Sequence, residues 1–140
     1  MGKQVRVFDL LTKKQSISVF KSQKKKNEIA EKLRLATLYE KQLQDILNSM
    51  LENKNHKTVA EIKSETWYKL KIQDELRANR NKIDFLNKEI VNQRMLVAKE
   101  SEKRKKFSER KDYFKKLESQ EKERKQENMT PSGIEKGLKP

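Results

Sequence analysis

The sequence predicts an all-α fold: an antiparallel two-helix coiled-coil hairpin, drawn out into an elongated rod. Three observations support this prediction. Between residues 3 and 130 the chain contains no glycine and no proline, the residues that tight turns most often need. Apolar residues recur at steps of three and four on both sides of one polar segment. Only 33% of the residues are hydrophobic, which suits a narrow seam between two helices better than a broad core.

The first helix is expected over residues 10–53, after an N-terminal segment at residues 1–9. Alternating steps of four and three from Ile29 trace one face of this helix, which is the period of a coiled-coil seam. The positions reached are Leu33, Ala36, Glu40, Leu43, Leu47 and Met50. Because this regular spacing continues over several heptads, it argues against disorder, the other structure that such a highly charged chain could have.

A turn is expected at about residues 54–58, within the polar, asparagine-rich sequence ENKNHKT. Thr58 and Glu61 have the spacing of a capping box, in which each side chain bonds the backbone N–H of the other residue. The second helix should therefore begin at about residue 59. A connection this short favours antiparallel packing of the two helices.

The second helix is expected over residues 59–127, followed by a flexible tail at residues 128–140. Its seam starts at Ile72 and continues through Leu76, Asn79, Ile83, Leu86, Ile90, Gln93 and Val97. Three polar residues interrupt the two seams: Glu40, Asn79 and Gln93. We expect them to help set the register between the helices.

The net charge of +14 is concentrated toward the ends of the chain. Residues 1–27 hold eight basic side chains and one acidic side chain, and residues 99–125 hold 12 and 7. In an antiparallel hairpin these two stretches should lie side by side and form a basic end. Its strongest basic runs are Lys24, Lys25 and Lys26, and Lys103, Arg104, Lys105 and Lys106, and its aromatic residues include Phe107 and Phe114.

The sequence contains no arrangement of residues that is typical of an enzyme. It has no cysteine, and its single histidine, His56, lies in the expected turn. No glycine-rich loop is available to cradle a phosphate, and the carboxylates alternate with basic residues as on a solvated helix face. We therefore expect no catalytic activity, no cofactor and no metal site. No apolar run approaches the length of a spanning helix, so a cytoplasmic location without membrane insertion is expected.

Tyr39, Trp67 and Tyr68 lie near the middle of the expected hairpin, and Trp67 is the only tryptophan. Aromatic residues at such positions either pack in the seam or remain partly exposed as anchors for a partner. The residue pattern leaves both alternatives open.

Three stretches of the chain resemble the flagellar and type III secretion export stalk proteins, the FliJ-like family. They are LRLATLYEKQLQDILN at residues 33–48, SETWYKLKIQDELRANRNKI at residues 64–83, and the charged segment at residues 94–124. The resemblance implies an antiparallel two-helix coiled coil similar to the central stalk of rotary ATPases. It also implies the partners of the family: a hexameric export ATPase, the cytoplasmic domain of the membrane export gate and, in some members, export chaperones.

The resemblance further implies a role for individual residues and a location at the membrane-associated export apparatus. Gate-binding residues would be Tyr39, Leu43, Trp67, Ile72 and Leu76. The basic end, with Phe107 and Phe114, would face the ATPase.

Two other functions fit the same sequence. One is a basic coiled coil that binds nucleic acid through phosphate contacts of Lys24–Lys26 and of residues 103–106. The other is a structural or regulatory coiled coil that forms oligomers. Tyr39 and Trp67 favour the export adaptor, because a nucleic-acid-binding hairpin has no need of aromatic residues far from its basic end.

Overall fold

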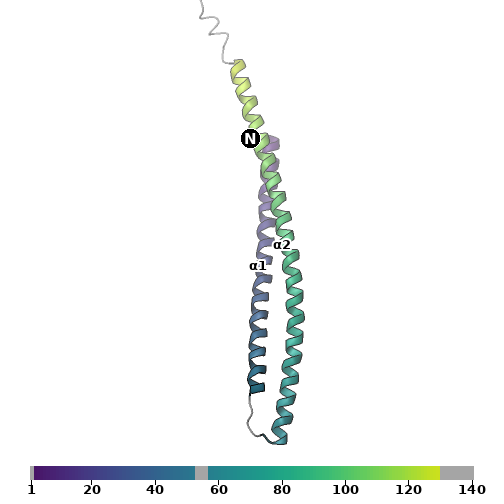
Figure 1. The fold of residues 1–140 in the computed structure, drawn as a ribbon. Coiled ribbons are helices and arrows are strands. Elements are labelled where there is room, and N and C mark those ends of the chain that lie inside the picture. The colour runs from purple at the N-terminus through teal and green to yellow at the C-terminus, as the bar shows by residue number, and fades with distance from the viewer. Residues whose placement is uncertain (1, 53–56, 130–140) are drawn as a thin grey trace, which may run out of the picture. The chain divides into compact units, whose positions relative to one another are not determined.

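A computed structural model describes residues 2–52 and 57–129 of the chain. This part of the chain forms two α-helices, α1 (Lys3–Glu52) and α2 (Val59–Met129), and contains no strand (Figure 1). The two helices pack against each other, which confirms the predicted all-α two-helix hairpin. The chain divides into two units, and each holds a segment of both helices. The central unit is Ser22–Leu96, and the terminal unit combines Met1–Lys21 with Val97–Pro140.

In the central unit the helices run antiparallel. Gln93 contacts the backbone of Ser22, whereas Asn79 contacts the backbone of Ala36. The position on α2 therefore falls by 14 residues as the position on α1 rises by 14. This equal and opposite progression shows that the two seams stay in register between these two contacts.

The core of the central unit consists of two apolar clusters between the helices. One contains Ile29, Ala36, Leu86 and Ile90, with Leu33 and Ile83 packed against it. The other contains Leu43, Ile72 and Leu76, with Leu47 and Met50 packed against it. All of these are seam positions predicted from the spacing of apolar residues. Because burying one such side chain fully contributes about 1.5–3 kcal/mol, the two clusters hold the helices together.

Each of the three polar seam residues contacts the opposite helix. Asn79 Nδ2 donates to the backbone carbonyl oxygen of Ala36 at 2.8 Å, and Gln93 Nε2 donates to that of Ser22 at 2.9 Å. Glu40 accepts a hydrogen bond from Arg80 Nε at 3.0 Å. The first two contacts satisfy amides that burial would otherwise penalise, whereas the Arg80–Glu40 pair is exposed.

The capping box predicted from the sequence is present at the start of α2. The Thr58 amide N donates to Glu61 Oε2 at 3.3 Å, and the Glu61 amide N donates to Thr58 Oγ1 at 3.2 Å. These bonds satisfy two backbone donors at the helix N-terminus that have no partner within the helix. Most of the expected turn at residues 54–58, together with His56, lies outside the described residues. The same is true of the expected tail from residue 130 onward.

The start of α1 differs from the expected one. The helix begins at Lys3 rather than near residue 10, so most of the segment expected to precede it is helical. Packing within the terminal unit explains this difference. Val5 is fully buried, Phe8 stacks on Phe114 with ring centroids 5.5 Å apart, and Asp9 forms an ion pair with Lys111 at 2.8 Å. These contacts to α2 stabilise the first turns of α1.

Candidate functional site

Leu35, Tyr39 and Ile46 recur along α1 at steps of four and seven, on one side of the helix. On α2, Tyr68 lines a pocket together with Ile46 and contacts Trp67. We call this surface the aromatic edge; it comprises Leu35, Tyr39, Ile46, Trp67 and Tyr68. Each of these side chains is between 42% and 59% exposed, which leaves a large part of its apolar surface in water. Aromatic residues exposed in a group are a feature of protein-binding surfaces.

Tyr39 links the two helices at this edge. Its hydroxyl donates a hydrogen bond to Glu75 Oε2 at 2.7 Å, from α1 to α2. This hydrogen bond to the carboxylate raises the pKa of Tyr39 above its ordinary value, since ionisation of the phenol would remove the donor. The contact fixes the orientation of the ring while its face stays accessible.

Trp67 and Tyr68 extend the edge on α2. Their rings meet edge to face, with centroids 5.9 Å apart and an interplanar angle of 73°. The Nζ atom of Lys71 lies 5.1 Å from the centroid of Trp67, within the range of a cation–π contact. The two rings therefore form one ordered aromatic surface with a cation beside it.

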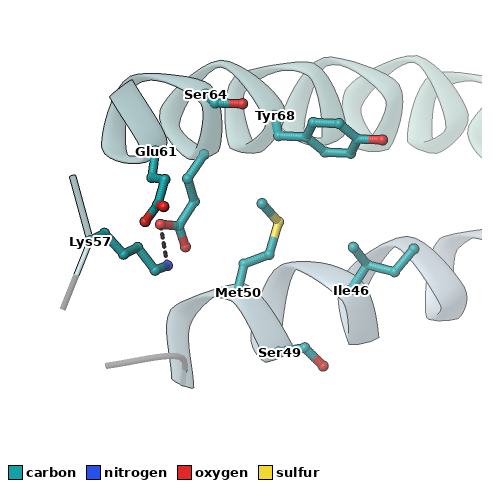
Figure 2. A pocket seen from close by; sticks show the side chains of 8 residues that line it. Ile46, Ser49, Met50, Lys57, Glu61, Ser64 and Tyr68 are labelled. Atoms are coloured by element: carbon teal, nitrogen blue, oxygen red, sulfur yellow. Dashed lines mark hydrogen bonds and ion pairs between the residues drawn. The ribbon is translucent and has the colours of Figure 1, made fainter. Parts of the chain in front are cut away.

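An open pocket of about 610 Å³ adjoins the aromatic edge, close to the first turn of α2. Figure 2 shows Met50 and Ile46 of α1 pointing toward Tyr68 of α2, which gives the pocket apolar walls. At its end an ion pair joins Lys57 to Glu65, and the hydrogen bond from Lys57 lowers the pKa of Glu65. The pocket can accept an apolar side chain of a partner next to a fixed pair of charges.

Three of the residues expected to bind the gate are buried between the helices. Leu43 is 4% exposed, Ile72 is 5% exposed and Leu76 is 3% exposed, and together they form the second core cluster. In this structure they are core residues and present no surface to a partner. Of the gate-binding residues expected from the resemblance, only Tyr39 and Trp67 remain on the surface. Seam positions and their neighbours share one helical stripe, and burial separates them; gate binding by Tyr39 and Trp67 stays a prediction.

The expected basic end is divided between the two units. Lys103, Arg104, Lys105 and Lys106 are all exposed in the terminal unit; we call them the basic run. No ion pair involves them within the described part of the chain. Lys24 and Lys25 are exposed and Lys26 is half-buried, but all three belong to the central unit. The two basic stretches therefore fall in different units, and their facing each other stays a prediction.

Phe107 and Phe114 are half-buried rather than free to face a partner. Their ring centroids lie 6.5 and 5.5 Å from that of Phe8 on α1. Arg110 lies over the ring of Phe114, 5.8 Å from its centroid. The two phenylalanines therefore hold the helices of the terminal unit together, and the exposed chemistry of this unit is its basic side chains.

Two residues that contact the aromatic edge were not predicted from the sequence. Glu75 holds Tyr39, and Lys71 contacts Trp67. A signal for Glu75 was available, because a step of seven from Tyr68 returns to the same side of an α-helix. The partner of Tyr39 on the other helix could be identified only once the register was known.

Comparison with protein-family models, with curated proteins and with solved structures yields no match to this chain. In residues 2–52 and 57–129, neither helix is long and apolar enough to cross a membrane. No group of three or more histidine, cysteine, aspartate or glutamate side chains in the same residues is placed to hold a metal ion.

Proposed function

We propose that this protein is a non-catalytic adaptor of a flagellar-type, or type III, protein export apparatus. It would work in the cytoplasm, at the membrane-associated apparatus, and couple the hexameric export ATPase to the cytoplasmic domain of the export gate, with export chaperones as further partners. The observation that carries the proposal is the aromatic edge, with Tyr39 held by Glu75 and the neighbouring rings exposed. Sequence resemblance to FliJ-like stalk proteins supplies the identity of the partners.

The aromatic edge suits a gate contact because its side chains are ordered before a partner binds. Tyr39 is fixed by its hydrogen bond, and Trp67 is flanked by Tyr68 and Lys71. Ordered tyrosine and tryptophan side chains lose little conformational entropy on binding, and they account for much of the affinity at protein interfaces.

The basic run suits a contact with an acidic surface such as the inside of an ATPase ring. Its four cations are consecutive in sequence, exposed and without an ion pair in the described residues. Unpaired surface charges of one sign accelerate association with an oppositely charged partner, and they orient the partner as it approaches. Since the basic run and the aromatic edge belong to different units, one molecule has separate surfaces for two partners.

Titration of the purified chain into the cognate export ATPase tests this proposal. We expect ATP hydrolysis to rise, or ring assembly to shift to lower ATPase concentration, while the chain alone hydrolyses no ATP. A Tyr39→Ala variant serves as the control, because it should stimulate the ATPase like the wild type. Absence of any effect over a wide concentration range would contradict the proposal.

Nucleic-acid binding is the second candidate, and the four unpaired cations of the basic run favour it. A protein that neutralises several phosphates loses about a thousandfold or more in affinity between 50 and 200 mM salt. Binding of a duplex oligonucleotide with that salt dependence, abolished by charge reversal in the basic run, would support this candidate. In that case the Tyr39→Ala variant should bind the oligonucleotide like the wild type, and the ATPase should be unaffected.

A further inference from the structure

A second surface of the central unit has a different chemistry from the aromatic edge. It is a shallow groove of about 560 Å³ between the helices, lined by residues of both. We call it the basic groove; its lining is Ala30, Leu33, Arg34, Thr37, Leu38 and Lys41 of α1, with Ile90 and Arg94 of α2. Two residues correspond to about 200° of rotation in an α-helix, so Lys41 and Tyr39 point to opposite sides of α1.

The floor of the basic groove is apolar. Ile90 is 5% exposed and belongs to the first core cluster, and Leu33 packs against that cluster. Leu38 stands higher, at the rim, where its side chain is 46% exposed. The groove therefore offers apolar surface on a buried floor and on an exposed leucine that a bound side chain could cover.

The charged part of the lining is entirely basic. Arg34, Lys41 and Arg94 line the groove, and no carboxylate does. Arg34 is engaged by Glu31, which accepts hydrogen bonds from Nε at 3.1 Å and from an Nη atom at 2.7 Å. Among the described residues, Lys41 and Arg94 have no ion pair. Two cations, one on each helix, are thus available to a ligand.

The spacing of the lining along α1 is that of a helix-packing surface. Arg34, Leu38 and Lys41 are separated by steps of four and three, so they form one stripe. Seven residues correspond to about 10.5 Å along the axis. A helix lying in the groove would meet a cation, a leucine and a second cation over two turns.

We propose that the basic groove binds an acidic amphipathic α-helix of a partner protein. Its apolar stripe would lie on Leu33, Leu38 and Ile90, as a third helix packed against the two-helix seam. Carboxylates flanking that stripe would pair with Lys41 on one side and Arg94 on the other. This inference does not depend on the proposed export function, because it rests on the groove alone.

Charge complementarity selects this occupant over others. A second copy of the chain would bring another net charge of +14, which opposes self-association at a basic surface. A nucleic acid could pair with Lys41 and Arg94 but would leave the apolar floor and Leu38 without matching contacts. An acidic helix with an apolar stripe satisfies both parts of the lining.

The test uses the full chain and a synthetic helical peptide of three heptads, with leucine at a and d and glutamate at e and g. A peptide with lysine in place of glutamate is the control ligand. We expect fluorescence anisotropy to show binding of the acidic peptide only. The Lys41→Glu/Arg94→Glu double variant should bind it at least about tenfold more weakly, as expected when interface residues worth more than 1 kcal/mol are lost.

A matched double variant separates the groove from the overall charge. Lys24→Glu/Lys63→Glu makes the same change in net charge at exposed positions of the central unit outside the groove. It should lower the affinity less than threefold. Equal losses in the two double variants, or equal binding of the acidic and basic peptides, would overturn the proposal. Circular dichroism of each variant verifies that the helices remain folded.

A local probe gives a second readout. Because the chain has no cysteine, a Thr37→Cys variant places a unique thiol in the groove. Thr66→Cys is the matched control, since both threonines are exposed and donate to the carbonyl oxygen four residues earlier. Acidic peptide at several times its Kd leaves at most about one fifth of the grooves free. It should therefore slow alkylation at position 37 at least about fivefold. If the peptide slowed alkylation equally at positions 37 and 66, or at neither, it would bind elsewhere and the proposal would be overturned.

Discussion

Asn79 of α2 donates a hydrogen bond from Nδ2 to the backbone carbonyl oxygen of Ala36 on α1, at 2.8 Å. Both residues are buried, with 7% and 5% of their surfaces exposed. The small side chain of Ala36 leaves the carbonyl accessible to an amide from the facing helix. A shift of α2 along the seam would bury the Asn79 amide without this acceptor, so the contact penalises other registers.

Replacing Asn79 with leucine should therefore keep the thermal stability of the hairpin but remove its preference for one register and one association state. We expect the Asn79→Leu variant to melt at the same temperature as the wild type or higher, because an apolar seam residue needs no acceptor. It should also form a mixture of association states, seen by analytical ultracentrifugation. Asn92→Leu, at an exposed position of the same helix, is the control and should leave a single species. A homogeneous Asn79→Leu variant in the native register would contradict this role.

Leu43 should contribute more to stability than an exposed leucine does. Its side chain is 4% exposed within the second core cluster, whereas Leu70 is 56% exposed. We expect Leu43→Ala to lower the free energy of unfolding of the central unit by about 2–5 kcal/mol, and Leu70→Ala by less than about 0.5 kcal/mol. Leu43→Asp should cost more, because it buries a carboxylate without a partner. Urea denaturation followed by circular dichroism measures these differences, and similar losses for both alanine variants would contradict the burial.

The capping box should stabilise the first turns of α2. Thr58→Ala removes the acceptor for the Glu61 amide, and we expect a loss of about 0.5–2 kcal/mol. Thr66→Ala is the control, because that hydroxyl bonds a carbonyl oxygen within the helix and caps nothing. Amide hydrogen exchange over residues 59–66 measures the effect locally. The prediction is wrong if exchange there accelerates no more in Thr58→Ala than in Thr66→Ala.

The ion pair between Asp9 and Lys111 should make the terminal unit sensitive to acid. The hydrogen bond from Lys111, and after it that from Lys13, lowers the pKa of Asp9 below its ordinary value. A carboxylate whose pKa is lower in the folded state stabilises the fold above the pKa of the unfolded state, about 3.9. That contribution is lost as the pH falls through the folded-state pKa.

The difference in melting temperature between wild type and Asp9→Asn should therefore be largest near pH 6 and decrease as the pH falls below about 3.9. Asp45→Asn, which changes an exposed carboxylate without an ion pair in the described residues, is the control. Melting curves from circular dichroism across this range supply the measurement. A difference that stays constant with pH would mean that the Asp9 carboxylate contributes nothing through its charge.

The proposed export function predicts that two variants lose different partners. Charge reversal at Lys103, Arg104, Lys105 and Lys106 should weaken binding to the ATPase, while helicity is kept because these side chains are exposed. Tyr39→Ala should leave that contact intact and weaken binding to the cytoplasmic gate domain. Association with the ATPase should also weaken with salt, by less than the roughly thousandfold loss of a phosphate binder. If both variants lost the same partner equally, the division between two surfaces would be wrong.

Most of the fold could be predicted from the sequence, because a coiled-coil seam leaves a direct trace in residue spacing. Steps of three and four located Ile29, Ala36, Leu86 and Ile90, all of which lie in one core cluster. The start of α1 was not predicted, since Val5, Phe8 and Asp9 are too few to show a period. Their helical state depends on contacts with residues about a hundred positions away.

The candidate sites were predicted less completely, for a related reason. Spacing along one helix shows that a residue lies near the seam, but it does not separate the buried middle of the stripe from its edges. Leu43 and Tyr39 are four residues apart, yet one is 4% exposed and the other 42%. The basic groove could not be predicted at all, because Arg94 joins Arg34 and Lys41 only through the register.

The sequence by itself determined the two helices, the capping box between them and the apolar seam, because each of these depends on residues close together in the chain. Only the tertiary structure decided which residues face each other: Asn79 with Ala36, Tyr39 with Glu75, Lys111 with Asp9. Those pairings depend on the register between two helices, which is set by packing and hydrogen bonds across the seam. The surfaces available to a partner follow from that register.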